Sequence, residues 1–364
     1  MHPLRTRSRA WLVAAAALAL SLAACSSDQN NPAGPSGSDF ARGGSPGPDL
    51  HAAIAAKNNH VDELMRNADV AGVAVGLNEA GKPAVKIYLA HGAARVPTSL
   101  DGVPVDVEIT GPFSVLPLGK GNKPDKNPHG GGGGGGGSLS PTSRWPRPVP
   151  IGISTGNIGE CSAGTIGARV TSGTRTYALS NNHVFALENT AAPGSAILQP
   201  GRYDTGCNSS QADQIGTLAK FNTISFSKNN TVDAALAEVD PANLGNSTPS
   251  GGYGTPSSTT RTATVGMAVE KYGRTTALTH GTVSAVDATV NVQYTSGVAT
   301  FVNQIIISGG HGAFSKAGDS GSLIVTDDGS HNPVGLLFAG SSRTTIANPI
   351  NDVLQTMGVT IDGK

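Results

Sequence analysis

The sequence predicts an all-β domain in its C-terminal part, preceded by a small α+β domain. The chain contains 49 glycines and 23 prolines among 364 residues, a composition typical of linkers and of a turn-rich all-β fold. From residue 151 onward, short β-rich runs are separated by Gly, Ser, Thr and Asn turns, which predicts a sandwich or a barrel. The runs are 164–170, 176–179, 234–239, 282–286, 304–307, 323–325 and 334–338.

Only the C-terminal end of this domain has helical spacing. Pro349 suits the start of a helix, and apolar residues follow at Ile350, Val353, Leu354 and Met357. We therefore expect one C-terminal helix after the strands.

Charge and hydropathy argue against a nucleic-acid-binding protein and against a protein with a membrane-spanning helix. The chain has 25 basic and 25 acidic residues, so its formal net charge is zero and it shows no basic footprint for nucleic acid. No stretch reaches the roughly 20 apolar residues that a membrane-spanning helix needs.

The N-terminus predicts a lipoprotein signal peptide over residues 1–25. Three arginines precede the apolar run Trp11–Leu22, which is too short to span a membrane and is typical of a signal peptide. The run ends in Leu-Ala-Ala-Cys, which resembles a bacterial lipobox and would make Cys25 the lipidated first residue of the mature protein. An ordinary small-residue cleavage site is the alternative. Ser26 follows in place of an aspartate, which resembles the usual sorting pattern for the outer membrane. We therefore expect a cell-envelope protein, attached to the membrane by its lipid or secreted.

The composition changes three times before the all-β domain. Residues 26–48 have almost no apolar side chains and predict a disordered tether. Residues 49–118 predict the small α+β domain, whose role as propeptide, inhibitor or docking domain stays open. Residues 119–150 form a Gly/Pro-rich linker that includes the glycine run 130–137. The all-β domain spans residues 151–364.

Within the α+β domain, the periodicity predicts one helix and three strands. Apolar residues recur at helical spacing between Leu50 and Ala68. Alternating patterns predict strands at 73–77, 85–89 and 103–109, and Asn78–Gly81 is a turn signal.

The two remaining cysteines, Cys161 and Cys207, are expected to form a disulfide. An exported chain folds in an oxidising compartment, where two cysteines usually pair. Two free buried thiols are the alternative. We expect no metal here, because neither a Cys-x-x-Cys nor a His-x-x-x-His spacing accompanies them.

The segment SKAGDSGSLIV (315–325) places a serine between two glycines, directly before an apolar strand. Gly, Asp and Ser all favour turns, so Gly318–Gly321 could be a turn and nothing more. The alternative is that the turn holds Ser320 as a nucleophile. A serine hydroxyl is a weak nucleophile at neutral pH, so this hypothesis requires a base and an acid that orients the base.

Two residues beside predicted strands can supply these groups. His183 follows a strand end in YALSNNHVFALEN, and Asp233 opens an apolar strand in NNTVDAALAEV. A buried acid is costly unless it is paired, and a histidine ring N–H would pair it and fix the tautomer. The competing candidates are His280 and His311 for the base, and Asp204, Asp213 and Asp240 for the acid.

These segments resemble the chymotrypsin-like (trypsin-fold) serine peptidases, whose triad follows the order His, Asp, Ser. LSNNHVFA, VDAALAEV and AGDSGSLI resemble the three boxes that carry the triad. KYGRTTALTHGTVSAV (271–286) resembles the strand pair before the nucleophile, and ANPINDVL (347–354) resembles the terminal helix. The Ser-Asn-Asn-His and Ala-Asn-Pro-Ile forms are most similar to a bacterial branch that includes the plant narrow-leaf protein. The resemblance covers about residues 151–360 and implies a double β-barrel.

The resemblance implies a serine endopeptidase that acts on polypeptides without a metal or an organic cofactor. His183 would be the general base, Asp233 its orienting acid and Ser320 the nucleophile. The backbone N–H groups of Gly318 and Ser320 would form the oxyanion hole. The specificity pocket would be formed by Phe314, Phe338, Ala339 and Gly340.

The chain departs from the family pattern in two places. Asn182 precedes His183, where the family has Ala or Cys, and no clean activation site precedes the domain. Pairing of Asp319 with a freed N-terminus is therefore not expected. The alternative function is a non-catalytic surface binding module with the protease fold. An esterase is disfavoured, because Gly-x-Ser-x-Gly and the order Ser, Asp, His are missing.

Overall fold

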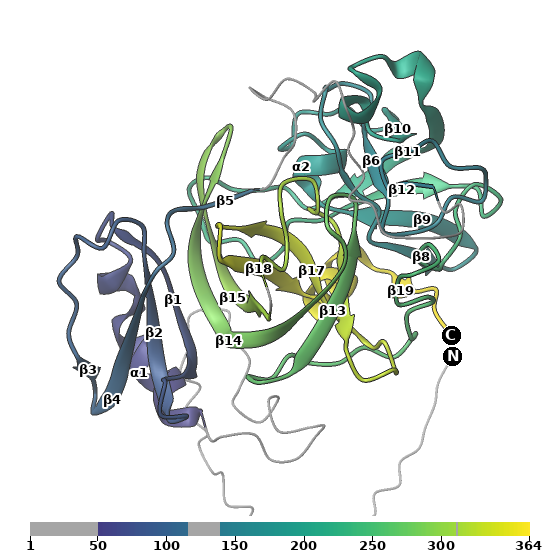
Figure 1. The fold of residues 1–364 in the computed structure, drawn as a ribbon. Helices are drawn as coiled ribbons and strands as arrows, with labels where there is room; N and C mark the ends of the chain where they lie inside the picture. Colours follow the sequence, from purple (N-terminus) through teal and green to yellow (C-terminus); the bar gives the residue numbers. More distant parts are fainter. Residues whose placement is uncertain (1–49, 116–138, 311) are drawn as a thin grey trace, which may run out of the picture. The chain divides into compact units, whose positions relative to one another are not determined.

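The structure of this chain is a computed structural model that describes residues 50–115, 139–310 and 312–364 (Figure 1). The predicted signal peptide with Cys25, the predicted tether and most of the predicted linker lie outside the described residues. The described strands form two sheets, one of eleven strands and one of eight. No helix among the described residues has the length and apolar character to cross a membrane.

Residues 50–115 form a helix and strands close to the predicted ones. The elements are α1 (His51–Leu64), β1 (Val70–Leu77), β2 (Pro83–Leu89), β3 (Ser99–Leu100), β4 (Val103–Ile109) and β5 (Phe113–Val115). The turn predicted at Asn78–Gly81 joins β1 to β2, and the Gly81 N–H donates to the Asn78 carbonyl at 2.9 Å. β2 and β4 pair in parallel, and aliphatic side chains of α1 pack against these strands.

Six strands of the larger sheet close into a barrel. They are β13 (Ala268–Gly273), β14 (Ala277–Tyr294), β15 (Gly297–Gly309), β16 (Leu323–Thr326), β17 (Pro333–Gly340) and β18 (Thr344–Pro349). Neighbours pair antiparallel in the order β13-β16-β17-β18-β15-β14, and β14 pairs again with β13, which closes the ring. The barrel core is aliphatic and aromatic, as the predicted runs of apolar residues require.

The strand β1 joins residues 50–115 to this barrel. β1 pairs antiparallel with β14, for example Val73 with Thr289 and Val75 with Val286. Lys57 of α1 adds an ion pair to Asp287, with Nζ 3.1 Å from Oδ1. The α+β segment and the barrel therefore share one continuous sheet.

The second sheet has eight strands in the order β19-β8-β9-β12-β11-β10-β6-β7. The strands are β6 (Ser154–Asn157), β7 (Gly164–Thr165), β8 (Ala168–Ser172), β9 (Arg175–Ser180), β10 (Ala196–Gln199), β11 (Asp213–Phe221), β12 (Ala235–Val239) and β19 (Thr360–Ile361). Short helices in the connections are α2 (Asn182–Phe185), η2 (Arg202–Thr205) and η3 (Ser209–Gln211). A separate apolar cluster fills the core of this sheet.

The C-terminal helix α3 (Ile350–Met357) begins directly after Pro349, as predicted. Ile350, Val353 and Met357 are buried, and Gly358 ends the helix with φ +71°, a conformation that favours glycine. The predicted fold class is confirmed. Two curled sheets, the larger of which closes into a barrel, fit the predicted all-β double barrel, with a C-terminal helix after them and a small α+β segment before them.

Candidate active site

The His183 and Asp233 side chains come from the ends of two paired strands. β9 ends at Ser180, Asn181 occupies the N-cap position of the short helix α2, and His183 lies in the only turn of that helix. β12 begins at Ala235, two residues after Asp233, and Ala235 pairs with Ser180. The strand pairing therefore places the two side chains next to each other.

His183 and Asp233 form a buried pair. His183 Nδ1 lies 2.7 Å from Asp233 Oδ2, and the His183 backbone N–H donates to Asp233 Oδ1 at 3.3 Å. The two side chains are 2% and 0% exposed. A buried carboxylate accepts rather than donates, so the ring proton belongs on Nδ1. Nε2 has no hydrogen-bond partner in the described part of the chain and can accept a proton.

The Asp233 backbone is held by two asparagines. Asn181 Nδ2 donates to the Asp233 carbonyl at 2.8 Å, and the Asp233 N–H donates to Asn348 Oδ1 at 3.1 Å. Asn348 Nδ2 in turn donates to Gln304 Oε1 at 2.7 Å. Asn182, which departs from the family pattern, donates instead to the Asn222 carbonyl at 2.7 Å.

Tyr294 is a site residue that sequence reasoning missed. Its hydroxyl donates to Asp233 Oδ2 at 2.8 Å, and its ring meets the His183 ring edge-on with centroids 6.1 Å apart. Burial and the negative charge of Asp233 raise the pKa of Tyr294, so the phenol stays protonated and remains a donor. Nothing in the sequence pattern distinguished this tyrosine from an ordinary apolar residue at the end of a strand.

The turn that carries Ser320 packs against the second sheet. The Thr165 N–H donates to the Ser320 carbonyl at 2.8 Å, and Ser180 Oγ donates to the Thr165 carbonyl at 2.8 Å. A Cβ at Gly321 would lie 2.2 Å from Ser180 Oγ, and φ there is +94°, so this position requires glycine. Ser320 therefore lies beside the strand end that leads to His183.

The Ser320 hydroxyl is buried and donates to the Phe338 carbonyl at 3.4 Å. In this structure it does not hydrogen-bond to His183. Without substrate, hydrogen bonds in active sites are often long or poorly aligned, and a rotation of the serine side chain redirects the hydroxyl.

The backbone N–H groups of the turn divide into two sets. Those of Asp319, Gly321 and Ser322 donate to the carbonyls of Lys316, Leu337 and Asp319. The N–H groups of Gly318 and Ser320 donate to no other described residue. Within the described part of the chain, the turn thus leaves the two N–H groups predicted for an oxyanion hole without acceptors.

Asp319 anchors the turn through hydrogen bonds and one ion pair. Its carboxylate accepts from the N–H groups of Thr275 at 2.8 Å, Thr276 at 3.2 Å and Lys316 at 2.9 Å. Lys271 Nζ lies 3.7 Å from Asp319 Oδ2, and both side chains are fully buried. Burial lowers the pKa of Lys271, while the charge of Asp319 opposes that shift. An internal lysine therefore supplies the cation, and this pair needs no freed N-terminus.

The four residues predicted for the specificity pocket lie in different surroundings. Phe314 is buried in the barrel core, with Lys271 Nζ 5.8 Å from its ring centroid. Phe338 packs against Phe301 with ring centroids 4.8 Å apart. Ala339 and Gly340 lie at the end of β17 and pair with β5.

The competing candidates lie elsewhere. His280 is exposed and bonds to Asp327, with Nδ1 2.9 Å from Oδ2. His311 lies outside the described residues. Asp204 and Asp213 pair with arginines, and Asp240 accepts from a backbone N–H in its own turn.

The predicted disulfide between Cys161 and Cys207 is present, with Cα atoms 5.1 Å apart. The loop that it closes contains His183. The alternative of two free thiols is therefore wrong.

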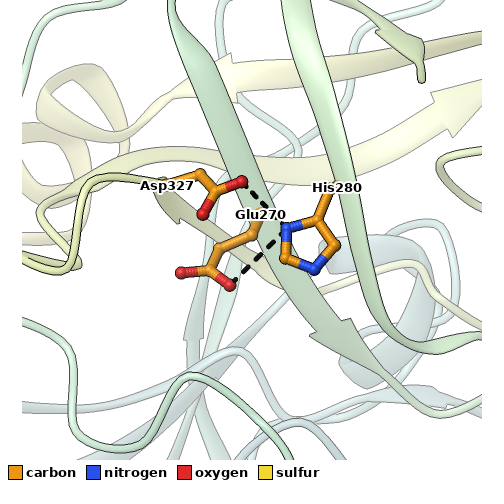
Figure 2. Close-up of side chains that lie close together, drawn as sticks. All are labelled: Glu270, His280 and Asp327. Carbon is orange, nitrogen blue, oxygen red and sulfur yellow. Dashed lines mark hydrogen bonds and ion pairs between the residues drawn. The ribbon is translucent and has the colours of Figure 1, made fainter.

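A second group of titratable side chains lies on the barrel, separate from the His183–Asp233 pair. Figure 2 shows Glu270, His280 and Asp327 turned toward one another, and their ligand atoms lie within 4.8 Å of each other. His331 Nδ1 lies 2.9 Å from Glu270 Oε1. Burial and the charge of Asp327 raise the pKa of Glu270. Two carboxylates and an imidazole could hold a divalent cation, but the same groups also satisfy one another as ion pairs.

Fold and site together define a class of protein. Two β-sheets, one of them a closed barrel, bring a buried His–Asp pair to a Gly-Asp-Ser-Gly turn, and this is the arrangement of a chymotrypsin-like serine protease fold. Residues 257–349 match the family model of the Nal1 C-terminal domain, which fits the predicted similarity to the plant narrow-leaf protein. No curated protein matches the chain.

Solved structures of serine proteases are similar to this chain. A glutamic acid-specific serine protease is 24% identical, covers 58% of this chain and 100% of its own, and has a TM-score of 0.43. Thermobifida fusca Protease A is 21% identical over 59% of this chain and 100% of its own, with a TM-score of 0.42. Cellulomonas bogoriensis chymotrypsin is 22% identical over 59% of this chain and 99% of its own, with a TM-score of 0.41.

Proposed function

We propose that the chain is a serine endopeptidase in which His183, Asp233 and Ser320 form the catalytic triad. One observation supports this most: the buried 2.7 Å contact between His183 Nδ1 and Asp233 Oδ2, which leaves Nε2 beside the serine turn without a hydrogen-bond partner among the described residues. A histidine buried only for packing would use both ring nitrogens or face an apolar core. Here one nitrogen is fixed by a carboxylate and the other is available for proton transfer.

The mechanism follows from these roles. His183 Nε2 takes the Ser320 proton while Oγ attacks the peptide carbonyl, and Asp233 stabilises the resulting imidazolium. The imidazolium then protonates the leaving amine, which leaves an acyl-enzyme that water hydrolyses by the same steps. The Gly318 and Ser320 N–H groups donate to the oxyanion, and loss of one such donor costs about 2.7–4 kcal/mol in other proteases.

The proposed specificity is for small or medium apolar residues before the cut bond. Phe314 carries no charge, and the nearby Lys316 would repel a substrate cation. A buried unpaired Arg or Lys side chain is expensive, so cleavage after these residues is expected to be poor. A cleavage profile on a peptide library tests this. A preference for Arg or Lys would refute the pocket assignment and leave the triad standing.

The proposed location is the cell envelope, with the chain attached by a lipid on Cys25. The support is the sequence alone, in the apolar run and the Leu-Ala-Ala-Cys end. Mass spectrometry of the exported protein tests this, and an unmodified Cys25 would contradict it.

Fluorophosphonate labelling of the purified chain tests the activity. Wild type should be labelled on Ser320, and Ser320→Ala should lose labelling and peptide cleavage while remaining folded. Ser322→Ala is the matched control, because its hydroxyl lies in the same turn and donates to the Asp319 carbonyl at 2.6 Å. Labelling that persists in Ser320→Ala would contradict the mechanism. A folded wild type that is never labelled would favour the alternative, a non-catalytic binding module.

A further inference from the structure

The last residues of β17 form a sheet edge beside Ser320. β16 pairs with the first part of β17, where Val325 lies opposite Pro333 and Leu323 lies opposite Leu336. Beyond this point the serine turn contacts β17, and the Gly321 N–H donates to the Leu337 carbonyl. The Phe338 carbonyl faces Ser320 Oγ at 3.4 Å. From there, Ala339 and Gly340 lead away from the nucleophile along an edge that β16 does not cover.

Strand β5 occupies this edge. Val115 pairs with Ala339 and Ser114 pairs with Gly340, in antiparallel register. Because β17 runs away from Ser320 toward Gly340, the antiparallel β5 runs toward Ser320 from its N-terminal to its C-terminal residue. An extended polypeptide that placed its backbone on this edge would follow the same path and the same direction.

β5 is held there by burial on both of its ends. Phe113 is 1% exposed and packs on Tyr88 with ring centroids 5.8 Å apart, while Val115 is 6% exposed in the same cluster as Phe338. On its other side β5 pairs in parallel with β14, where Phe113 lies opposite Val292. β5 is therefore an integral strand of the sheet, paired on both sides.

We infer that residues 50–115 act as an intramolecular inhibitor in which β5 occupies the edge that an extended polypeptide substrate would need. The inference rests on the proposed function, and it selects the inhibitor among the three roles that the sequence left open. Addition of a strand to a free edge is a common way to bind an extended peptide. The β1–β14 pairing keeps β5 at high effective concentration beside the edge, so a free peptide competes poorly.

A matched pair of substitutions in the full chain tests this. Val115→Asp puts a charge at a buried position of β5 and should expel the strand from the sheet. Val107→Asp makes the same chemical change on β4, where the side chain is 44% exposed. We expect Val115→Asp to raise kcat/KM for an apolar chromogenic peptide at least tenfold, and Val107→Asp to leave it unchanged. Val115→Ala, which is milder, should give a smaller increase and guards against misfolding of the Asp variant.

Labelling with a small fluorophosphonate separates the two hypotheses, because this probe needs Ser320 but no sheet edge. Labelling of all variants together with faster peptide cleavage by the Val115 variants supports the inference. Labelling of all variants with equal cleavage rates refutes the inhibitor and leaves the proposed function intact. Absence of labelling in every folded variant refutes the proposed function and the inference with it.

Discussion

Tyr294→Phe tests whether the missed tyrosine positions the proposed triad. The substitution removes one hydroxyl and keeps the ring, which also packs on Phe226 and Phe301 with centroids 5.9 and 6.1 Å away. That hydroxyl donates to Asp233 Oδ2 at 2.8 Å, and the same oxygen lies 2.7 Å from His183 Nδ1. In the variant, Oδ2 keeps His183 and loses its second donor.

The expected magnitude follows from the charge and burial of the acceptor. A hydrogen bond to a charged group contributes about 1.5–3 kcal/mol, and a buried acceptor left without its donor loses that stabilisation. Unfolding free energy should therefore fall by about 1.5–3 kcal/mol. A carboxylate with one donor fewer also holds the imidazole less firmly, so kcat should fall by about tenfold or more with little change in KM.

The assay is kcat and KM on a peptide substrate, normalised to the fraction of enzyme that a fluorophosphonate titrates, beside urea unfolding of the same samples. Tyr88→Phe is the control, because the Tyr88 hydroxyl is buried and makes no hydrogen bond to His183, Asp233 or Ser320. Its removal should leave kcat unchanged. A Tyr294→Phe enzyme with wild-type kcat and wild-type stability would show that the hydroxyl does not support Asp233. A loss of stability with unchanged kcat would reduce Tyr294 to a structural role.

Three further predictions concern the barrel and the loop around the base. Lys271→Met should lower the unfolding free energy by about 3–5 kcal/mol, because Asp319 stays buried without its cation, and urea unfolding should show partial recovery in the double variant with Asp319→Asn. Reduction of Cys161–Cys207 should cost about 2–4 kcal/mol, and an unchanged urea midpoint with reductant would contradict this. Because the pKa of Glu270 is raised, its stabilising contribution is complete below the usual glutamate pKa of 4.5 and is lost as pH rises through the raised pKa. Relative to wild type, Glu270→Gln should therefore gain stability as pH rises above 4.5, and parallel stability curves would refute the assignment.

Local patterns predicted much of the fold. Alternating apolar residues gave strands at 73–77, 85–89 and 103–109, which correspond to β1, β2 and β4. Pro349 and the spacing after it gave α3. These predictions agree with the structure because the apolar periodicity of a strand or a helix depends only on residues that are close in sequence.

Resemblance and pairing chemistry together predicted the contact between His183 and Asp233. The His box and the Asp box lie 50 residues apart, yet their contact follows once β9 and β12 are known to pair. The turn at Gly318–Gly321 also follows from sequence, because positive φ at its glycines is a local requirement.

Contacts between segments that are far apart in the sequence could not be predicted. Tyr294 ends an apolar strand and gives no sign that its hydroxyl reaches Asp233, 61 residues away. Lys271 occupies one position of an alternating strand, where a lysine normally faces water. The β1–β14 and β5–β17 pairings join segments that are separated by a linker, so no periodicity within either segment encodes them.

The anchoring of Asp319 and the occupancy of the β17 edge bear on the same question of control. If Asp319 needed a freed N-terminus as its cationic partner, the serine turn would form only after the chain is cut. Here Lys271 and three backbone N–H groups already hold Asp319, so the serine turn is formed in the uncut chain. Cutting the chain is then not needed to build the proposed catalytic site. Control of the proposed activity must instead act on the access of substrate to Ser320. The edge of β17 beside Ser320 is covered by β5. Displacement of one short strand would free that edge without any change in the triad, which is why the Val115 variants should alter peptide cleavage and leave fluorophosphonate labelling as it is.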